Sequence, residues 1–116
     1  GTVFSTFYDE AAPANDEAAA FVDGFKAYLT SIGESDIIPA VSALGYDAYI
    51  TAVQAIKDAD SIDPAAIKDA LKNVHVEGVT GDITFDENGD ANKDMAYIKT
   101  IKDGQIVFLT TTSIDE

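Results

Sequence analysis

The pattern of apolar residues changes after Lys72, and this change constrains the fold more than any other feature of the sequence. Up to that residue, apolar side chains recur at the spacing of helices. Beyond it, glycines separate short runs rich in Val, Ile, Thr, Phe and Tyr, residues that favour strands. The separating glycines are Gly78, Gly81, Gly89 and Gly104. The sequence therefore predicts an α/β fold in which three helices pack with a small sheet.

The first two helices have recognisable ends. Asn15 can cap a helix that continues to Gly33, and acidic residues follow it at the end where a helix dipole favours them. A second helix is predicted to begin near Pro39, because proline suits the first turn. Apolar and alanine positions surround most of its circumference. We therefore expect this second helix to be buried between neighbouring elements.

The third helix has the clearest start signal in the chain. Asp63 can cap it, Pro64 fits its first position, and Ile62 is placed to pack onto Ile67 across the cap. Ile67 and Leu71 are expected to form its buried stripe.

Strands are predicted at both ends of the chain. Residues 2–8 alternate between polar and apolar side chains, which is the period of a strand, and residues 9–13 follow as a loop. Near the other end, Asp103 and Gly104 join residues 97–101 to residues 105–109, a pattern typical of a hairpin.

Composition excludes several classes of function. The 116 residues suit one domain, and 21 acidic against 7 basic residues give a net charge of −14, which opposes binding to nucleic acid or anionic membranes. The absence of cysteine excludes disulfides, thiolate metal sites and cysteine nucleophiles. No apolar run approaches the roughly 20 residues of a membrane span. Because the chain begins without Met, we expect a processed product, a recombinant segment or a proteolytic fragment.

One segment superficially resembles a calcium loop. Oxygen-bearing side chains alternate along it at Asp86, Asn88, Asp90, Asn92 and Asp94. However, Ala91 stands where a calcium loop requires glycine, and Tyr97 stands where it requires its bidentate glutamate. A strand at residues 83–85 followed by a turn over residues 86–90 is the favoured interpretation, and no metal is predicted.

No catalytic residue is predicted. His75 is the only histidine and has no local nucleophile or carboxylate motif, while Glu77, Asp82 and Asp86 could pair only through the tertiary fold. Phosphate-binding loops, nucleophile elbows and zinc-binding helix motifs are absent from the sequence. We therefore expect neither enzymatic activity nor a cofactor.

Four segments resemble, in order, the C-terminal region of class I periplasmic binding proteins of the Leu/Ile/Val type. They are ALGYDA at residues 43–48, DPAAIKDAL at 63–71, EGVTGDITFDENGD at 77–90 and KDGQIVFL at 102–109. The earlier FSTFYDE and FVDGFKAYL stretches resemble the preceding strand and helix of that family. The resemblance therefore covers essentially all of residues 1–116, taken as a single fragment.

The resemblance implies the C-terminal portion of a two-lobed fold that holds a ligand between its lobes. The three helices would belong to one lobe, and the first strand and final hairpin to the other. The chain would cross between lobes near Asp9 and between Asp90 and Ala96. Most of the residues that bind the ligand would lie upstream of this segment. One position in relatives can carry an aromatic ligand contact; here it is Val41, and Val41 and Ser42 are the candidate ligand-binding residues.

The function implied is that of an extracytoplasmic solute-binding component, periplasmic or lipid-anchored, which delivers branched-chain amino acids or similar molecules to an ABC permease. Lobe closure around the ligand would produce the form that the permease recognises. A ligand-sensing domain of the same fold in a membrane receptor is one alternative, and an unrelated acidic interaction module is another.

The resemblance also implies exposed surfaces, because family members are much longer than this chain. Something must cover the strand edges and helix faces that remain. We expect an exchanged or face-to-face homodimer, or strands rearranged into a small helix-backed sheet.

Overall fold

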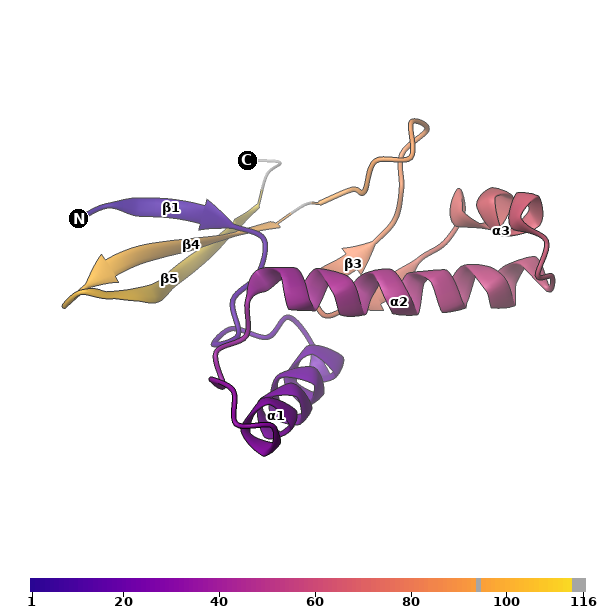
Figure 1. Ribbon diagram of the computed structural model, residues 1–116. Helices are drawn as coiled ribbons and strands as arrows, with labels where there is room; N and C mark the ends of the chain where they lie inside the picture. Colours follow the sequence, from indigo (N-terminus) through magenta and orange to yellow (C-terminus); the bar gives the residue numbers. More distant parts are fainter. Residues whose placement is uncertain (94, 114–116) are drawn as a thin grey trace.

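The computed structural model describes residues 1–93 and 95–113 and divides into a helical part and a sheet part (Figure 1). The elements in chain order are β1 (Val3–Thr6), α1 (Asp16–Ser31), α2 (Ala40–Ala59), α3 (Pro64–Leu71), β2 (Val76–Gly78), β3 (Gly81–Ile83), β4 (Met95–Lys102) and β5 (Gln105–Ser113). The α/β class and the three predicted helices are confirmed. Within the described residues, no helix is both long and apolar enough to cross a membrane.

Helix starts follow the predicted capping residues. The Asn15 side chain accepts a hydrogen bond from the backbone N–H of Ala18 at 2.8 Å, and Asp63 caps α3 with Pro64 at its first position. The predicted packing of Ile62 onto Ile67 is wrong, because Ile62 is 91% exposed. The backbone N–H of Asp63 instead donates to the Ser61 hydroxyl in a tight turn, which leaves Ile62 in solvent.

The predicted burial of α2 on most sides is also wrong. Only one stripe of the helix is buried, formed by Ala43, Asp47, Thr51 and Ala55 at four-residue intervals. Val41 and Tyr49 are each 69% exposed. The described residues cover α2 with α3 and β2 and, where Tyr46 packs on Phe21, with α1. Much of its remaining apolar surface lies open.

Strands β1, β4 and β5 form an antiparallel sheet with β4 in the centre. Asp103 and Gly104 both have positive φ, 52° and 77°, and form the predicted two-residue turn between β4 and β5. The strand predicted at residues 83–85 is shifted: β3 ends at Ile83, and Phe85 forms only an isolated bridge with Ala91. β3 pairs with β2 in a separate two-stranded sheet.

The core lies in the helical part and is small. Its buried members are Tyr8, Ala18, Ile38, Ala43 and Val79. Helices α1 and α2 pack on β2 of the two-stranded sheet rather than on the three-stranded sheet.

The chain is more extended than a compact monomer. Its Cα radius of gyration is 16.2 Å, whereas about 13 Å is expected for this length. Its accessible surface is 7604 Å², about 1,500 Å² above the value expected for a folded chain of this mass.

Candidate functional site

Two crossing segments join the helical part to the sheet part (Figure 1). The first follows β1 and includes Tyr8 and Asp9; the second precedes β4 and includes Lys93. These positions agree with the crossings predicted near Asp9 and between Asp90 and Ala96; Asp94 lies outside the described residues. Polar contacts hold each crossing in place.

Asp9 fixes the first crossing to the sheet. Its buried carboxylate forms an ion pair with Lys99 of β4, with 2.8 Å between Oδ2 and Nζ. The other carboxylate oxygen accepts a hydrogen bond from the backbone N–H of Ala11 at 2.8 Å. Since a buried charge must be paired, this geometry defines the position of Asp9 closely.

Glu10, the next residue, fixes the same crossing to the helical part. One carboxylate oxygen accepts a hydrogen bond from the backbone N–H of Ile38, at 2.9 Å, just before α2. The other pairs with the Lys26 ammonium of α1 at 3.1 Å. Adjacent acids therefore connect one crossing to both parts of the molecule.

Asp47 of α2 organises the β2–β3 turn. Its carboxylate accepts hydrogen bonds from the backbone N–H groups of Val79 and Thr80, at 2.6 and 2.9 Å, and from the Thr80 hydroxyl at 2.6 Å. The Thr80 hydroxyl oxygen also accepts a bond from the Lys93 ammonium at 2.7 Å. A chain of polar contacts thus runs from the centre of α2 to the second crossing.

Two buried tyrosines lie close to the first crossing. Burial, followed by the nearby charges of Glu10 and Asp9, raises the pKa of Tyr8 to about 12. Burial also raises the pKa of Tyr97, with a smaller contribution from Asp9. The Tyr8 hydroxyl has no hydrogen-bond partner within residues 1–93 and 95–113. Both rings are therefore neutral at physiological pH.

A hollow of about 250 Å³ lies at the junction of the two parts. Its lining comprises Ala14, Asn15, Glu77, Thr80, Gly81, Asp82, Lys93, Met95 and Tyr97. Glu77 and Asp82 lie directly opposite each other in the β2–β3 register, and Lys93 contributes the opposite charge. This mixture of charges suits a small polar molecule better than an apolar one.

A second hollow, of about 350 Å³, is an apolar groove between α2, α3 and β3. The large apolar side chains that line it include Leu44, Ile67, Leu71 and Phe85. The predicted stripe of Ile67 and Leu71 therefore faces this groove, where both side chains are half-buried. Such a surface packs against protein rather than binding a polar solute.

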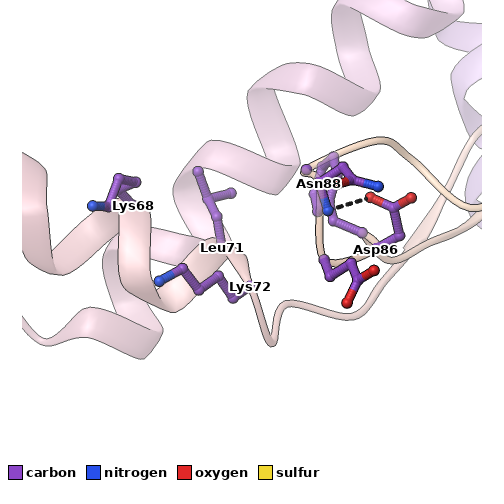
Figure 2. Close-up of a pocket in the computed structure, with 8 residues that line it drawn as sticks. Lys68, Leu71, Lys72, Asp86 and Asn88 are labelled. Atoms are coloured by element: carbon purple, nitrogen blue, oxygen red, sulfur yellow. Dashed lines mark hydrogen bonds between the residues drawn. The ribbon is translucent and has the colours of Figure 1, made fainter.

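The calcium-like segment forms a turn opposite α3. The Asp86 carboxylate accepts hydrogen bonds from the backbone N–H groups of Asn88 and Asp90, each at 2.9 Å, and such hydrogen bonds lower the pKa of Asp86. Figure 2 shows this turn across a hollow of about 270 Å³ from Lys68 and Lys72. The predicted turn is confirmed. Through residues 1–93 and 95–113, no three His, Asp or Glu side chains gather as metal ligands.

Val41 and Ser42 lie in the first turn of α2 and do not line the hollows described above. Val41 is exposed, and Ser42 is half-buried with its backbone N–H bonded to the Pro39 carbonyl at 2.9 Å. His75 lies 3.6 Å from an oxygen of Asp82 on the exposed surface. None of these residues joins the polar contacts at the crossings.

Sequence reasoning missed the role of Asp47 and Lys93. A signal for Asp47 was present, because an acid within the stripe Ala43, Asp47, Thr51 and Ala55 must find hydrogen bonds if the stripe is buried. Lys93 offered no such signal, since its partner Thr80 is distant in sequence.

Comparison with known proteins shows the family. A family model described as periplasmic binding protein matches residues 1–105. The chain belongs to the periplasmic binding protein family. The leucine-binding protein LivK of Thermotoga maritima is 34% identical to it, and the match covers 99% of this chain and 31% of LivK with a TM-score of 0.78.

Two structures of ABC transporter substrate-binding proteins from Desulfitobacterium hafniense are also similar. Each is 27% identical over 92% of this chain and 30% of the other, with TM-scores of 0.71 and 0.69; the second was solved in complex with Leu. This periplasmic binding protein chain therefore spans about a third of the length of its solved relatives. The predicted fold class, a portion of a periplasmic-binding-protein-like fold, is confirmed.

Proposed function

We propose that residues 1–116 form the C-terminal part of a solute-binding protein that delivers branched-chain amino acids or related molecules to an ABC permease. The observation that carries this proposal is the match to a leucine-binding protein along 99% of the chain. The Leu complex of a second relative supports the same ligand class.

The proposed task is binding, without bond chemistry. Two lobes would close around the solute, and the crossings fixed by Asp9–Lys99 and by Lys93–Thr80 would limit the path of that closure. Val41 and Ser42 would supply one wall of the cleft, because the start of α2 lies near the first crossing (Figure 1). The remaining grip would come from other parts of the protein.

The proposed location is extracytoplasmic, either free in a periplasm or lipid-anchored at the cell surface. The name of the family supports this location. A net charge of −14 also suits a protein that must stay soluble and avoid anionic membrane surfaces.

Thermal unfolding of the full-length protein with individual amino acids tests the function. Leucine, isoleucine or valine at a hundred times the dissociation constant should stabilise it by about 2.7 kcal/mol. D-leucine is the matched control for non-specific effects. The proposal would be refuted if neither branched-chain amino acids nor related solutes raised the unfolding temperature.

The wall residues are tested by Val41→Arg in the same protein, with Tyr49→Arg as control because the two side chains are equally exposed on α2. Only Val41→Arg should weaken leucine binding, by tenfold or more, corresponding to about 1.4 kcal/mol. Equal leucine affinities in the two variants would mean that Val41 does not form part of the cleft wall.

A further inference from the structure

Helix α2 begins without a side-chain cap of its own. Its N-cap is Pro39, whose side chain cannot accept a hydrogen bond from the first turn, and that turn contains no acidic residue. The segment that leads to it, residues 32–37, is exposed throughout. The contacts of the next residue, Ile38, therefore have a large part in fixing where the helix starts. Val41 and Ser42 lie at this start.

Ile38 is held by its side chain and by its backbone. The side chain is buried in the core with Tyr8 and Ala43. The backbone N–H donates a hydrogen bond to a carboxylate oxygen of Glu10 at 2.9 Å. A hydrogen bond to an ionised acceptor is stronger than one between neutral groups. The carboxylate also brings negative charge to the N-terminal end of α2, where the helix dipole favours it.

Lys26 of α1 fixes the direction of the Glu10 carboxylate. Its ammonium bonds to the other carboxylate oxygen at 3.1 Å, and neither side chain is more than 33% exposed. The preceding residue, Asp9, is joined to Lys99 of β4 at 2.8 Å. Two adjacent acids of the first crossing therefore connect α1, the start of α2 and β4.

We propose that Glu10 is a positioning residue for solute binding. Through Ile38 it holds the first turn of α2 beside the first crossing (Figure 1). This inference rests on the proposed function and on the cleft wall assigned to Val41 and Ser42. Without Glu10, α2 would still form, because the buried stripe that begins at Ala43 does not involve it. Its first turn would shift relative to the crossing, and the solute would meet a displaced wall.

Isothermal titration of the full-length protein with leucine and with valine tests this role. Glu10→Ala should weaken leucine binding by about tenfold, within the range that couples neighbouring residues. It should also change the ratio of the leucine and valine affinities, because a displaced wall meets the two side chains differently. A smaller fraction of folded protein would instead lower both affinities by the same factor. Glu10→Gln, which keeps an oxygen acceptor for the Ile38 N–H, should restore most of the affinity.

Glu17→Ala is the matched control. Glu17 also contacts α2, because its carboxylate accepts a hydrogen bond from the Tyr46 hydroxyl at 2.9 Å, but this contact is exposed and lies beyond the first turn. Its removal should leave both affinities and their ratio unchanged. If Glu10→Ala does not fold, Lys26→Met provides the test, since it removes only the ion pair that orients the carboxylate. It should change the affinity ratio in the same direction, and an unchanged ratio would overturn the inference.

Combining Glu10→Ala with Val41→Ala separates this inference from the proposed function. Because Glu10 acts through the wall, the losses of leucine affinity in the two single variants should be less than additive in the double variant. Additive losses, or a Glu10→Ala protein that binds leucine as tightly as the unmodified one, would overturn the inference and leave the proposed function standing. An unmodified full-length protein that binds no branched-chain amino acid would overturn both.

Discussion

At the residue scale, Asp47 connects helix α2 to the β2–β3 turn. Its three hydrogen bonds come from Val79 and Thr80, and the carboxylate is buried. Asp47→Asn should lower the free energy of unfolding by about 2–4 kcal/mol, because an amide nitrogen would face a donor and leave it unpaired. Urea unfolding followed by circular dichroism measures the change.

Asp58→Asn is the control, since Asp58 lies on the exposed surface of α2 and its carboxylate accepts a hydrogen bond from the Gln54 side chain of the same helix. Asp58→Asn should change the free energy of unfolding by no more than about 0.5 kcal/mol. Equal stabilities of the two variants would mean that the carboxylate of Asp47 is not needed to hold the turn.

Tyr8 makes the stability of the chain sensitive to alkali. Its pKa is about 12 in the folded state against about 10 for an unfolded chain. The folded state therefore retains the proton more tightly: the stability contributed is complete below pH 10 and is lost as the pH rises from 10 to 12. Between pH 7 and pH 11, the unmodified chain should lose about 1 kcal/mol more stability than Tyr8→Phe.

At pH 7, Tyr8→Phe should be neutral or slightly stabilising, because the hydroxyl that it removes is buried without a partner among the described residues. Tyr49→Phe, a change at an exposed tyrosine, should keep the pH dependence of the unmodified chain. Parallel pH profiles for Tyr8→Phe and the unmodified chain would count against the assigned pKa.

At the element scale, the sequence predicted those features that depend on neighbouring residues, namely the helix starts and the hairpin turn. Asn15, Asp63 and Pro64 mark helix starts through bonds to residues within one turn, and Asp103 with Gly104 determines the hairpin turn. The positions of β2 and β3 were not predictable in this way. The turn between them is held by α2, more than thirty residues earlier in the chain.

The close approach of β2 to α2 requires glycine at position 78. A Cβ atom there would lie 2.6 Å from Ile83 Cδ1 and 2.8 Å from Asp47 Cγ. Gly78→Ala should therefore cost about 1–3 kcal/mol of stability. Gly45→Ala, inside α2 with open space around it, should instead stabilise by about 0.5–1 kcal/mol. Thermal unfolding measures the change in stability of each variant. Two changes of the same sign would contradict the prediction.

At the scale of the whole molecule, the sequence could not show which surfaces remain open. The apolar circumference of α2 predicts burial only if enough neighbours are present, and in the described residues α3, β2 and part of α1 leave much of it uncovered. The candidate site was limited in the same way: Val41 and Ser42 came from family resemblance, whereas the contacts of Asp47 and Lys93 depend on tertiary structure.

The net charge of −14 acts on the molecule as a whole, and salt tests its effect. Like charges repel more strongly in the folded chain than in the expanded unfolded chain. The screening length falls from about 30 Å at 0.01 M to about 8 Å at 0.15 M. Raising NaCl over this range should stabilise the chain by about 1 kcal/mol, or roughly 5 °C in melting temperature.

The buried pair Asp9–Lys99 opposes this trend only weakly, because buried charges are screened less than exposed ones. KCl at equal ionic strength should give the same shift as NaCl, because screening depends on ionic strength and not on the identity of the cation. A melting temperature that falls with salt would show that attractive ion pairs, and not the acidic surplus, dominate the electrostatics of the fold.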